Sequence, residues 1–529
     1  PDQQLLIVYC HGMHDGEQRV FVFLNLGTLM AMLRVLDGQW MQLELMLQHR
    51  QFAGTGFGKG NPDKAVFASH IGADFIRPDV GYFSAALVGR AFDEHGFLPR
   101  QHHSNRGLPG AFRAPPKGKI PPFPFQATFM PAISRRTSEL GTENAFVVLA
   151  EVNELARQGR DIISFCIGQP DFHTPKHIQE AAIRAVREGR HGYTASAGID
   201  ELRAAAARYM GDMRGLSIRP EDTVVAAGAK PFIAYSILSV TDYGAGEEVI
   251  YPNPGFPIYE SQILANGAVP VPLHLREGRD FAFDPADLER LITPKTRMLI
   301  LNSPHNPTGG VLSASDLDAI AAVLRRHPQV WIYADEIYSR LCYGQKFASI
   351  ASLPDMFERT IIADGASKTW AMTGWRIGFA SNPLLAPHFV RWITNTESCA
   401  SHISQWAAVQ AIEGPQDDAE MMRASFLERR DLIVGLLNNV PGVTCRTPGG
   451  AFYVWPNVTE ACRMTGAADS EDFRKRLLNE CGVAVLADIH FGSRVPDEGQ
   501  HIRFSYAASK DAIEKGVARM AEMVSRGRP

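Results

Sequence analysis

Short apolar runs alternate with amphipathic helical patterns from about residue 130 to the C-terminus, and this alternation constrains the fold more than any other feature. Residues 178–190 carry apolar side chains at i, i+3 and i+4 spacing, and residues 201–210 continue in the same way. The pattern predicts an α/β fold with a mostly parallel sheet, helices on both of its faces, and a smaller α/β domain. Such sheets bind ligands at the carboxyl ends of their strands. The predicted strands are 223–227, 248–251, 298–301, 330–334 and 360–363.

The chain is expected to divide into three parts. Residues 171–399 form a large ligand-binding domain, while residues 130–170 join residues 400–529 in the smaller α/β domain. Residues 1–129 have weak periodicity and include a proline-rich stretch at 113–125, whose composition favours an extended linker. They are an N-terminal extension of unknown role. The alternatives are upstream sequence or a poorly ordered segment on one hand, and an appended regulatory domain on the other.

Composition excludes several classes of function. With 45% hydrophobic and 21% charged residues, the chain has the balance of an ordinary soluble protein, and its net charge of −4 indicates no nucleic-acid partner. The seven cysteines include no CxxC pair and their number is odd, so they are expected to be reduced thiols in the cytoplasm. The longest apolar run, 20–33, is too short to cross a membrane. No metal ion is expected.

A lysine and an arginine stand close together in the segment DGASKTWAMTGWRIGF at 364–379. A lysine whose pKa is lowered by apolar walls or neighbouring cations can form an imine with an aldehyde cofactor. The planar fork of arginine suits a bidentate hold on phosphate. Lys368 and Arg376 are therefore candidates for these two roles, although a Ser-Lys pair before a turn is by itself more often a solvated surface feature.

The apolar run at 330–334 is followed by Asp335, a carboxylate that is costly to bury unless a cationic group meets it. A protonated pyridine nitrogen is such a group. A carboxylate that keeps this nitrogen charged lets the ring accept electrons when a substrate Cα–H bond breaks. Tyr338 could donate to the phenolic oxygen of the same ring. The alternative for Asp335 is a strand-end residue that caps the next helix.

Three further segments offer ligand contacts on constrained backbone. Asn306 lies in a turn with two prolines and two glycines, where its amide could bind a flat ligand with little ordering cost. Gly228, Ala229 and Lys230 stand between a strand and a helical run, the arrangement in which backbone N–H groups receive phosphate. Phe256 lies on a rigid turn and could stack on a pyridine ring, although a lone aromatic is more often part of the core.

In this order, the segments SPHNPTGG, ADEIY and SKTWAMTGWRIGF resemble the class I/II pyridoxal-phosphate-dependent aminotransferases of fold type I, specifically their bacterial aspartate aminotransferase-like branch. The resemblance covers roughly residues 130–525. It implies that Lys368 carries pyridoxal 5'-phosphate as a Schiff base and shuttles the proton. The phosphate ligands that it implies are Ser367, Arg376 and the backbone of Gly228, Ala229 and Lys230. For the pyridine ring it implies Asp335 as the partner of the nitrogen, Tyr338 and Asn306 as partners of the phenolic oxygen, and Phe256 as the stacking aromatic.

The resemblance extends to substrate and subunit contacts. In the segment HIRFSYAAS, Arg503 matches the arginine that binds the substrate α-carboxylate, with Gly168, Phe256 and Asn306 around the substrate. Tyr193 matches a tyrosine that reaches the phosphate of the neighbouring subunit. The resemblance therefore implies a homodimer with shared active sites.

Two features bear on the choice of substrate. Lys230 lies where some aspartate-using members place a lysine for the distal carboxylate, which argues for acidic substrates. Many relatives have Trp or Tyr where this chain has Phe256, and residues 485–491 lack the usual Pro-Gly before their aromatic, so the approach of the smaller domain to the substrate is expected to differ.

The Asn253–Pro254 and Asn306–Pro307 bonds match prolyl bonds that are cis in relatives.

The predicted activity is transamination between an L-amino acid and a 2-oxo acid by a ping-pong mechanism, in a cytoplasmic enzyme. The nearest alternative keeps the cofactor and is a carbon–sulfur β-lyase, which releases ammonia and pyruvate without a keto-acid acceptor. A remote alternative is a regulator with an aminotransferase-like sensor domain, although residues 1–129 have no evident helix-turn-helix pattern. The expected partners are small-molecule amino and 2-oxo acids, with no nucleic acid and no membrane.

Overall fold

The computed structural model describes residues 6–12, 18–24, 41–47, 84–85, 133–138, 140–141 and 144–527. The chain divides into two compact units, residues 1–127 and 128–529, and each is described by itself. The predicted linker at 113–125 lies outside the described residues.

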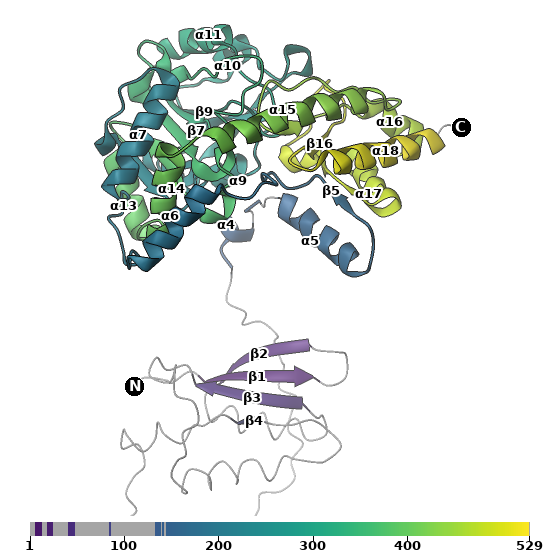
Figure 1. The fold of residues 1–529 in the computed structure, drawn as a ribbon, viewed down its shortest axis with the longest axis horizontal. Coiled ribbons are helices and arrows are strands. Elements are labelled where there is room, and N and C mark those ends of the chain that lie inside the picture. Colours follow the sequence, from purple (N-terminus) through teal and green to yellow (C-terminus); the bar gives the residue numbers. More distant parts are fainter. Residues whose placement is uncertain are drawn as a thin grey trace, which may run out of the picture. The chain divides into compact units, whose positions relative to one another are not determined.

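The first unit contains a four-stranded sheet with the order β2-β1-β3-β4 (Figure 1). β1 is antiparallel to both β2 and β3, and β4 is parallel to β3. Only the start of the apolar run 20–33 is described, and it lies in β2. The strands are β1 (Leu6–Gly12), β2 (Gln18–Leu24), β3 (Met41–Leu47) and β4 (Ser84–Ala85).

A seven-stranded sheet forms the centre of the second unit, with the order β6-β12-β11-β10-β9-β7-β8. Its neighbours are parallel except at β12, which is antiparallel to β11 and β6, so the predicted mostly parallel sheet is confirmed. All five predicted strands are present. The strands are β6 (Thr223–Ala226), β7 (Glu248–Asn253), β8 (Val269–His274), β9 (Thr296–Asn302), β10 (Trp331–Asp335), β11 (Thr360–Gly365) and β12 (Gly378–Ser381).

Helices cover both faces of this sheet because successive strand residues point to opposite sides. Met298 of β9 packs in a core with α8, α9 and α13, whereas the next residue, Leu299, packs in a core with α10 and α11. On the Leu299 side, β11 and β6 pack against α6, α7 and α14. The helices are α6 (Lys176–Arg187), α7 (Asp200–Arg214), α8 (Pro231–Val240), α9 (Ile258–Ala265), α10 (Pro285–Leu291), α11 (Ala314–Arg325), α12 (Ala366–Thr369), α13 (Ala386–Thr396) and α14 (His402–Glu413).

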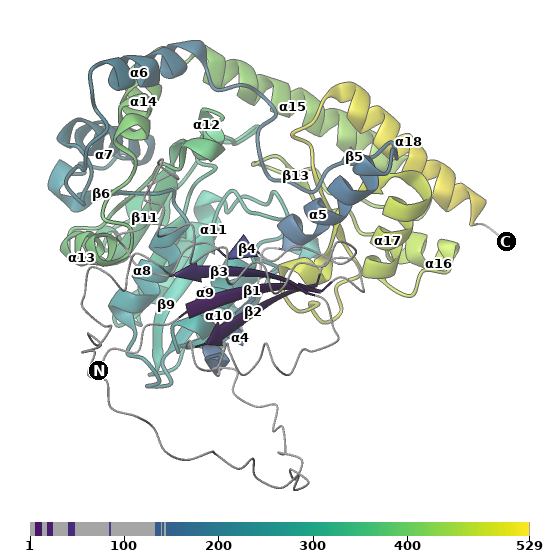
Figure 2. The same cartoon turned by 90° about the horizontal axis from the view of Figure 1, so that it is seen from below.

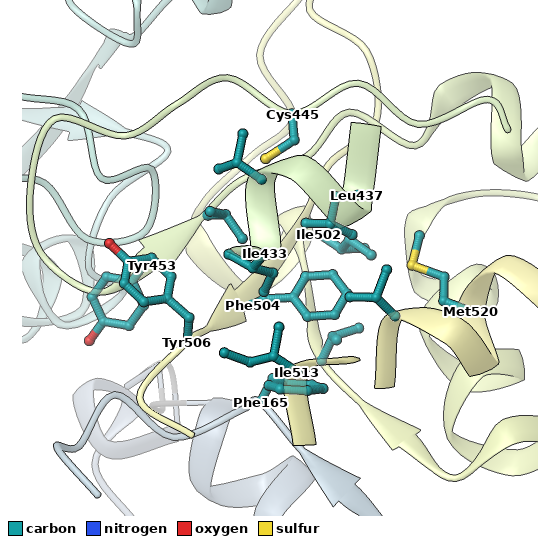
Figure 3. Close-up of a cluster of buried hydrophobic side chains, with 14 of the residues drawn as sticks. Phe165, Ile433, Leu437, Cys445, Tyr453, Ile502, Phe504, Tyr506, Ile513 and Met520 are labelled. Carbon is teal, nitrogen blue, oxygen red and sulfur yellow. The ribbon is translucent and has the colours of Figure 1, made fainter. Parts of the chain in front are cut away.

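Most of the remaining elements pack around small sheets, one with the order β13-β16-β15 and one in which β14 pairs with β5, whereas α4 contacts α9. In their core, Phe504 is surrounded by Ile433, Ile513 and Met520, and Tyr453 lies at one edge (Figure 3). The elements are α4 (Arg135–Ser138), α5 (Asn144–Arg157), β5 (Ile163–Ser164), α15 (Asp417–Asn438), β13 (Tyr453–Val454), α16 (Thr459–Thr465), α17 (Ser470–Cys481), β14 (Val483–Ala484), β15 (Leu486–Ala487), β16 (Ile502–Ser505) and α18 (Lys510–Arg526).

α14 and α15 connect the two parts of this unit. α14 follows the predicted boundary at residue 400, yet its residues Ala407 and Ala411 pack in one core with Ile178 of α6 and Leu202 of α7. α15 then runs from the side of α14 to α18, as both views show (Figures 1 and 2). No helix in the described part of the chain is long and apolar enough to span a membrane.

Candidate active site

A cavity of about 470 Å³ opens at the carboxyl ends of β9 and β10, beside the start of α8. Its size is typical of a site for a small ligand. Eleven of the residues predicted from the sequence line this one cavity. They are Gly168, Ala229, Lys230, Phe256, Asn306, Asp335, Tyr338, Ser367, Lys368, Arg376 and Arg503.

Lys368 projects into the cavity from the short helix α12, which directly follows β11. Its Nζ donates to the carbonyl oxygen of Gly168 at 2.7 Å and lies 6.0 Å from the centre of the Tyr338 ring. The amine is half-buried. An amine held against apolar rings at the floor of a cavity is in a suitable position for covalent chemistry with a ligand carbonyl.

Asp335 ends β10 and is buried at the same cavity. Its Oδ2 accepts a hydrogen bond from the Tyr259 hydroxyl at 2.7 Å, and its Oδ1 has no hydrogen-bond partner among the described residues. Burial raises the pKa of Asp335 to about 6, with the Tyr259 hydrogen bond and the Lys368 charge opposing the rise. A buried carboxylate oxygen without a donor fits a ligand that brings a protonated nitrogen.

Arg503, on β16, is 3% exposed and lies between two aromatic rings. Its guanidinium carbon is 4.6 Å from the Tyr453 ring centre and 4.8 Å from that of Phe491. Nη1 donates to Asn306 Oδ1 at 2.9 Å, and Nη2 donates to the Cys166 carbonyl. The side chain is thus fixed in place with Nε still unpartnered in the described part of the chain, which suits a carboxylate ligand.

The residues near the start of α8 can hold a phosphate. The start of α8 presents Gly228, Ala229 and Lys230, and Arg376 lies beside them, with Nη2 donating to the Ala227 carbonyl at 3.2 Å. Gly228 has a φ of 100°, and a Cβ there would overlap the Arg376 guanidinium, so only glycine allows this approach. Helix-start N–H groups with an arginine form a binding site for an anion.

Aromatic side chains form part of the cavity walls. Phe256 lies in the turn after β7, with its ring 5.3 Å from Lys230 Nζ and edge-on to Tyr259. The Tyr338 hydroxyl is 2.8 Å from that of Tyr453. The Asn253–Pro254 and Asn306–Pro307 bonds near these walls are both cis, as the sequence predicts.

Two predicted site residues do not line the cavity: Gly228, which lies against the Arg376 guanidinium at its edge, and Tyr193, which lies away from it. The side chain of Tyr193 is 89% exposed and lines a separate depression with His191, Cys399 and Ser401. Within one chain, Tyr193 therefore does not take part in the site described above.

Sequence reasoning missed two tyrosines of the site. Tyr259 follows Phe256 by one helical turn, so the stretch YPNPGFPIY contained the signal that both rings share a face. Tyr453 lies on β13 and packs so closely over Gly168 that a Cβ there would overlap its hydroxyl. No local pattern marks Tyr453, because its contacts with Gly168 and Tyr338 span more than a hundred residues.

These groups match pyridoxal phosphate in their chemistry, and they line one cavity. Arg376, Ser367 and the start of α8 would hold its phosphate, Asp335 its pyridine nitrogen, and Lys368 its aldehyde carbon. The orphaned Asp335 Oδ1 and the glycine-dependent cradle at residue 228 are both accounted for by this cofactor.

Comparison with known proteins identifies the family. Residues 160–520 match the family described as aminotransferase class I and II. An aspartate aminotransferase of Geobacillus stearothermophilus is 38% identical over 391 residues, which cover 73% of this chain and 98% of that protein. An aspartate/prephenate aminotransferase of Cereibacter sphaeroides is 37% identical over 401 residues, covering 74% and 98%.

A solved structure of aspartate aminotransferase from Thermus thermophilus with maleate matches 74% of this chain and 100% of that chain, with a TM-score of 0.69 and 34% identity. These relatives are aminotransferases, so they give no support to a lyase. The family and the fold predicted from the sequence are thereby confirmed. Since the match covers more than half of the chain and includes all eleven predicted residues that line the cavity, the chain belongs to the class I and II aminotransferases, enzymes that use pyridoxal phosphate to carry out transamination.

Proposed function

We propose that this enzyme moves the amino group of an acidic L-amino acid, aspartate first among them, to a 2-oxo acid by a ping-pong mechanism. The observation that carries the proposal is the single cavity lined by a lysine amine, a buried carboxylate and a buried arginine, Lys368, Asp335 and Arg503. When bound, pyridoxal phosphate supplies an aldehyde carbon that takes up the amino group and a pyridine ring that accepts the electrons of the broken Cα–H bond.

The side chains of the protein supply orientation and proton transfer. Arg503 and Asn306 bind the substrate α-carboxylate, with Gly168 beside them, and so place Cα near Lys368. With the cofactor bound, Lys368 Nζ would take the proton from the substrate Cα and hold it for the later return step. The Asp335 carboxylate keeps the pyridine nitrogen protonated, because a fixed negative charge stabilises the cationic form. Tyr338 and Asn306 donate to the phenolic oxygen.

Lys230 supports an acidic donor. It lines the cavity, and its Nζ lies 5.3 Å from the ring centre of Phe256, which is one of the predicted substrate contacts. The relatives named above include aspartate aminotransferases, and one was solved with maleate, a four-carbon dicarboxylate like aspartate. A distal carboxylate that meets Lys230 would gain a charged hydrogen bond.

The Lys230→Ala variant is expected to raise KM for aspartate roughly 10- to 100-fold, since a hydrogen bond to a charged group is worth about 1.5–3 kcal/mol. KM for a donor without a second carboxylate, such as alanine, should change little. Initial rates with aspartate and alanine, each with 2-oxoglutarate or pyruvate as acceptor, measure both. The exposed Lys346 provides a matched control, since Lys346→Ala removes a charge away from the cavity. Equal KM changes for both donors would contradict an acidic substrate.

We further propose that the enzyme is a homodimer in which Tyr193 completes the site of the other subunit. Two observations support this. Tyr193 is almost fully exposed, which is unusual for an aromatic side chain, and it lines a depression separate from the cavity, where another chain could reach it. A two-fold dimer would give each site the Tyr193 of its neighbour.

Hybrid dimers test this arrangement. A Lys368→Ala chain paired with a Tyr193→Ala chain has one site free of both substitutions, so a hybrid purified through two different tags should recover about half of the activity of the unsubstituted dimer. The matched control pairs an unsubstituted chain with a chain that carries both substitutions. It has the same composition but no intact site, and it should stay well below the first hybrid. Equal activity of the two hybrids would argue against a shared site.

Residues 171–413 are proposed as the large cofactor domain, with the boundary placed after α14 because that helix packs against α6 and α7. Residues 130–170 and 414–529 then form the smaller domain that closes over the substrate. A cytoplasmic location is proposed with the rest, and the role of residues 1–129 is left open between the alternatives given by the sequence.

A further inference from the structure

A buried ion network lies directly behind the cavity. Arg214, the last residue of α7, has no exposed side-chain surface. Its Nε donates to Glu336 Oε2 at 2.6 Å and its Nη2 donates to Asp364 Oδ2 at 3.0 Å. Burial raises the pKa of both carboxyls, while the Arg214 guanidinium opposes the rise. None of these three residues lines the cavity.

The network alternates with the cavity residues along the segment after β10. Asp335 and Tyr338 line the cavity, whereas Glu336 points back to Arg214. Ser339 also points back, with its Oγ donating to Asp364 Oδ2 at 2.9 Å. The segment that carries Asp335, the proposed partner of the pyridine nitrogen, is thus fixed by hydrogen bonds of two residues that do not line the cavity, Glu336 and Ser339.

Asp364 connects the same network to the lysine. It is the last residue but one of β11 and has no exposed surface, and its Oδ1 accepts from the Gly365 backbone N–H at 2.8 Å. Ser367 and Lys368 follow within one helical turn and line the cavity. Asp364 therefore accepts hydrogen bonds from α7, from the segment after β10 and from its own turn, which ties both cavity segments to one point.

Stability alone gives a weak reason for this network. Burying ions requires their desolvation, and well-packed apolar residues of similar volume often replace a buried ion pair without loss of stability. Here one buried arginine is shared by two buried carboxyl groups, so the network contains one more acidic group than basic groups. An arrangement of this kind is better explained by the geometry it imposes, since the fork of arginine fixes two partners at once.

We propose that Arg214 is a positioning residue for the reaction: through Glu336 and Asp364 it holds the segments of Asp335, Tyr338 and Lys368 at the spacing that proton transfer requires. The inference rests on the proposed function. It assigns Arg214 no contact with substrate or cofactor. Its effect is on the relative placement of groups that do make such contacts.

Two variants test this role in the cofactor-loaded enzyme. Arg214→Lys keeps the charge and loses the fork, and Ser339→Ala removes one link without touching a charge. Because a misplacement of about 1 Å can lower a rate roughly 100-fold, Arg214→Lys should lower kcat about 10- to 100-fold while KM changes less than about threefold. Ser339→Ala should lower kcat by a smaller factor. The pH midpoint of the visible absorption of the bound cofactor should move by at least about 0.5 in Arg214→Lys.

Arg219 provides the matched control. It pairs with Asp222 through two bonds of 2.8 Å, but its side chain is 63% exposed and lies outside the network. Arg219→Met should leave kcat, KM and the absorption midpoint unchanged. The inference is overturned if Arg214→Lys and Ser339→Ala keep all three values, or if they lower only the melting temperature. If the unsubstituted enzyme shows neither transamination nor visible absorption, the proposed function fails, and this inference fails with it.

Discussion

Replacement of Lys368 by alanine is expected to abolish transamination and to remove the visible absorption of the cofactor-loaded enzyme. In the proposed function, Lys368 is both the amine that binds the cofactor covalently and the base that moves the proton from Cα, so the variant loses both. Since a positioned general base alone contributes about 10²- to 10⁴-fold, the loss in kcat should be at least about 10⁴-fold. Steady-state rates with aspartate and 2-oxoglutarate and an absorption spectrum of the loaded protein measure the two effects.

Lys230→Ala is the matched control for Lys368→Ala, because both lysines line the same cavity. It should keep the absorption band and most of kcat at saturating donor, so a general disturbance of the cavity can be told apart from the loss of one amine. If Lys368→Ala kept both the band and the turnover, the lysine would not be the covalent residue and the assignment of the site would be wrong.

The sequence predicts the central sheet well because its strands are buried on both faces. Runs such as Met298–Leu301 are apolar at every position, and they contact α8 and α9 on one side and α11 on the other. The sequence pattern does not predict β8, whose VPVPLH contains two prolines, or β12, which has four residues. Their neighbours in the sheet decide their conformation, and this information is not local.

The cavity is predictable to the extent that its residues stand in short segments of unusual chemistry. Lys368 and Arg376 share one segment and Asp335 and Tyr338 another, and the carboxyl ends of parallel strands bring these segments together. Tyr453 and Arg214 act through partners more than a hundred residues away, so no local pattern can indicate them. The position of α14 is a similar case, since its packing on α6 depends on the whole fold.

Asp335→Asn is expected to lower kcat about 10²- to 10³-fold, the range seen when a fixed electrostatic partner of a reacting group is removed. The amide has nearly the shape of the carboxylate and its oxygen can still accept from Tyr259, but it carries no charge to hold the pyridine nitrogen protonated. KM should change less, because the proposed substrate contact, Arg503, is held by Asn306 and not by Asp335. Tyr259→Phe, which removes a hydrogen bond and keeps the charge, should have a much smaller effect on kcat.

The same substitution should stabilise the cofactor-free protein at neutral pH. The pKa of Asp335 is about 6 in the folded chain, against an ordinary value of 3.8, so between these pH values the folded protein retains a proton that the unfolded chain has released. The free energy of unfolding therefore falls as pH rises from 3.8 to about 6. Above pH 6 the full loss of stability that comes from burying the ionised carboxylate, roughly 3 kcal/mol, is present. Asparagine has no such cost because it does not ionise.

Urea unfolding of both cofactor-free proteins should therefore show Asp335→Asn as the more stable at pH 7.5, with a difference that shrinks as pH is lowered through 6 towards 4. Asp318→Asn, at an exposed side chain of α11, provides the control and should show no such dependence. Equal stability at pH 7.5 would mean that the carboxylate already has a cationic partner without the cofactor. If Asp335→Asn instead gains stability and loses activity, then the buried carboxylate lowers the stability of the fold and is retained because the cofactor needs it.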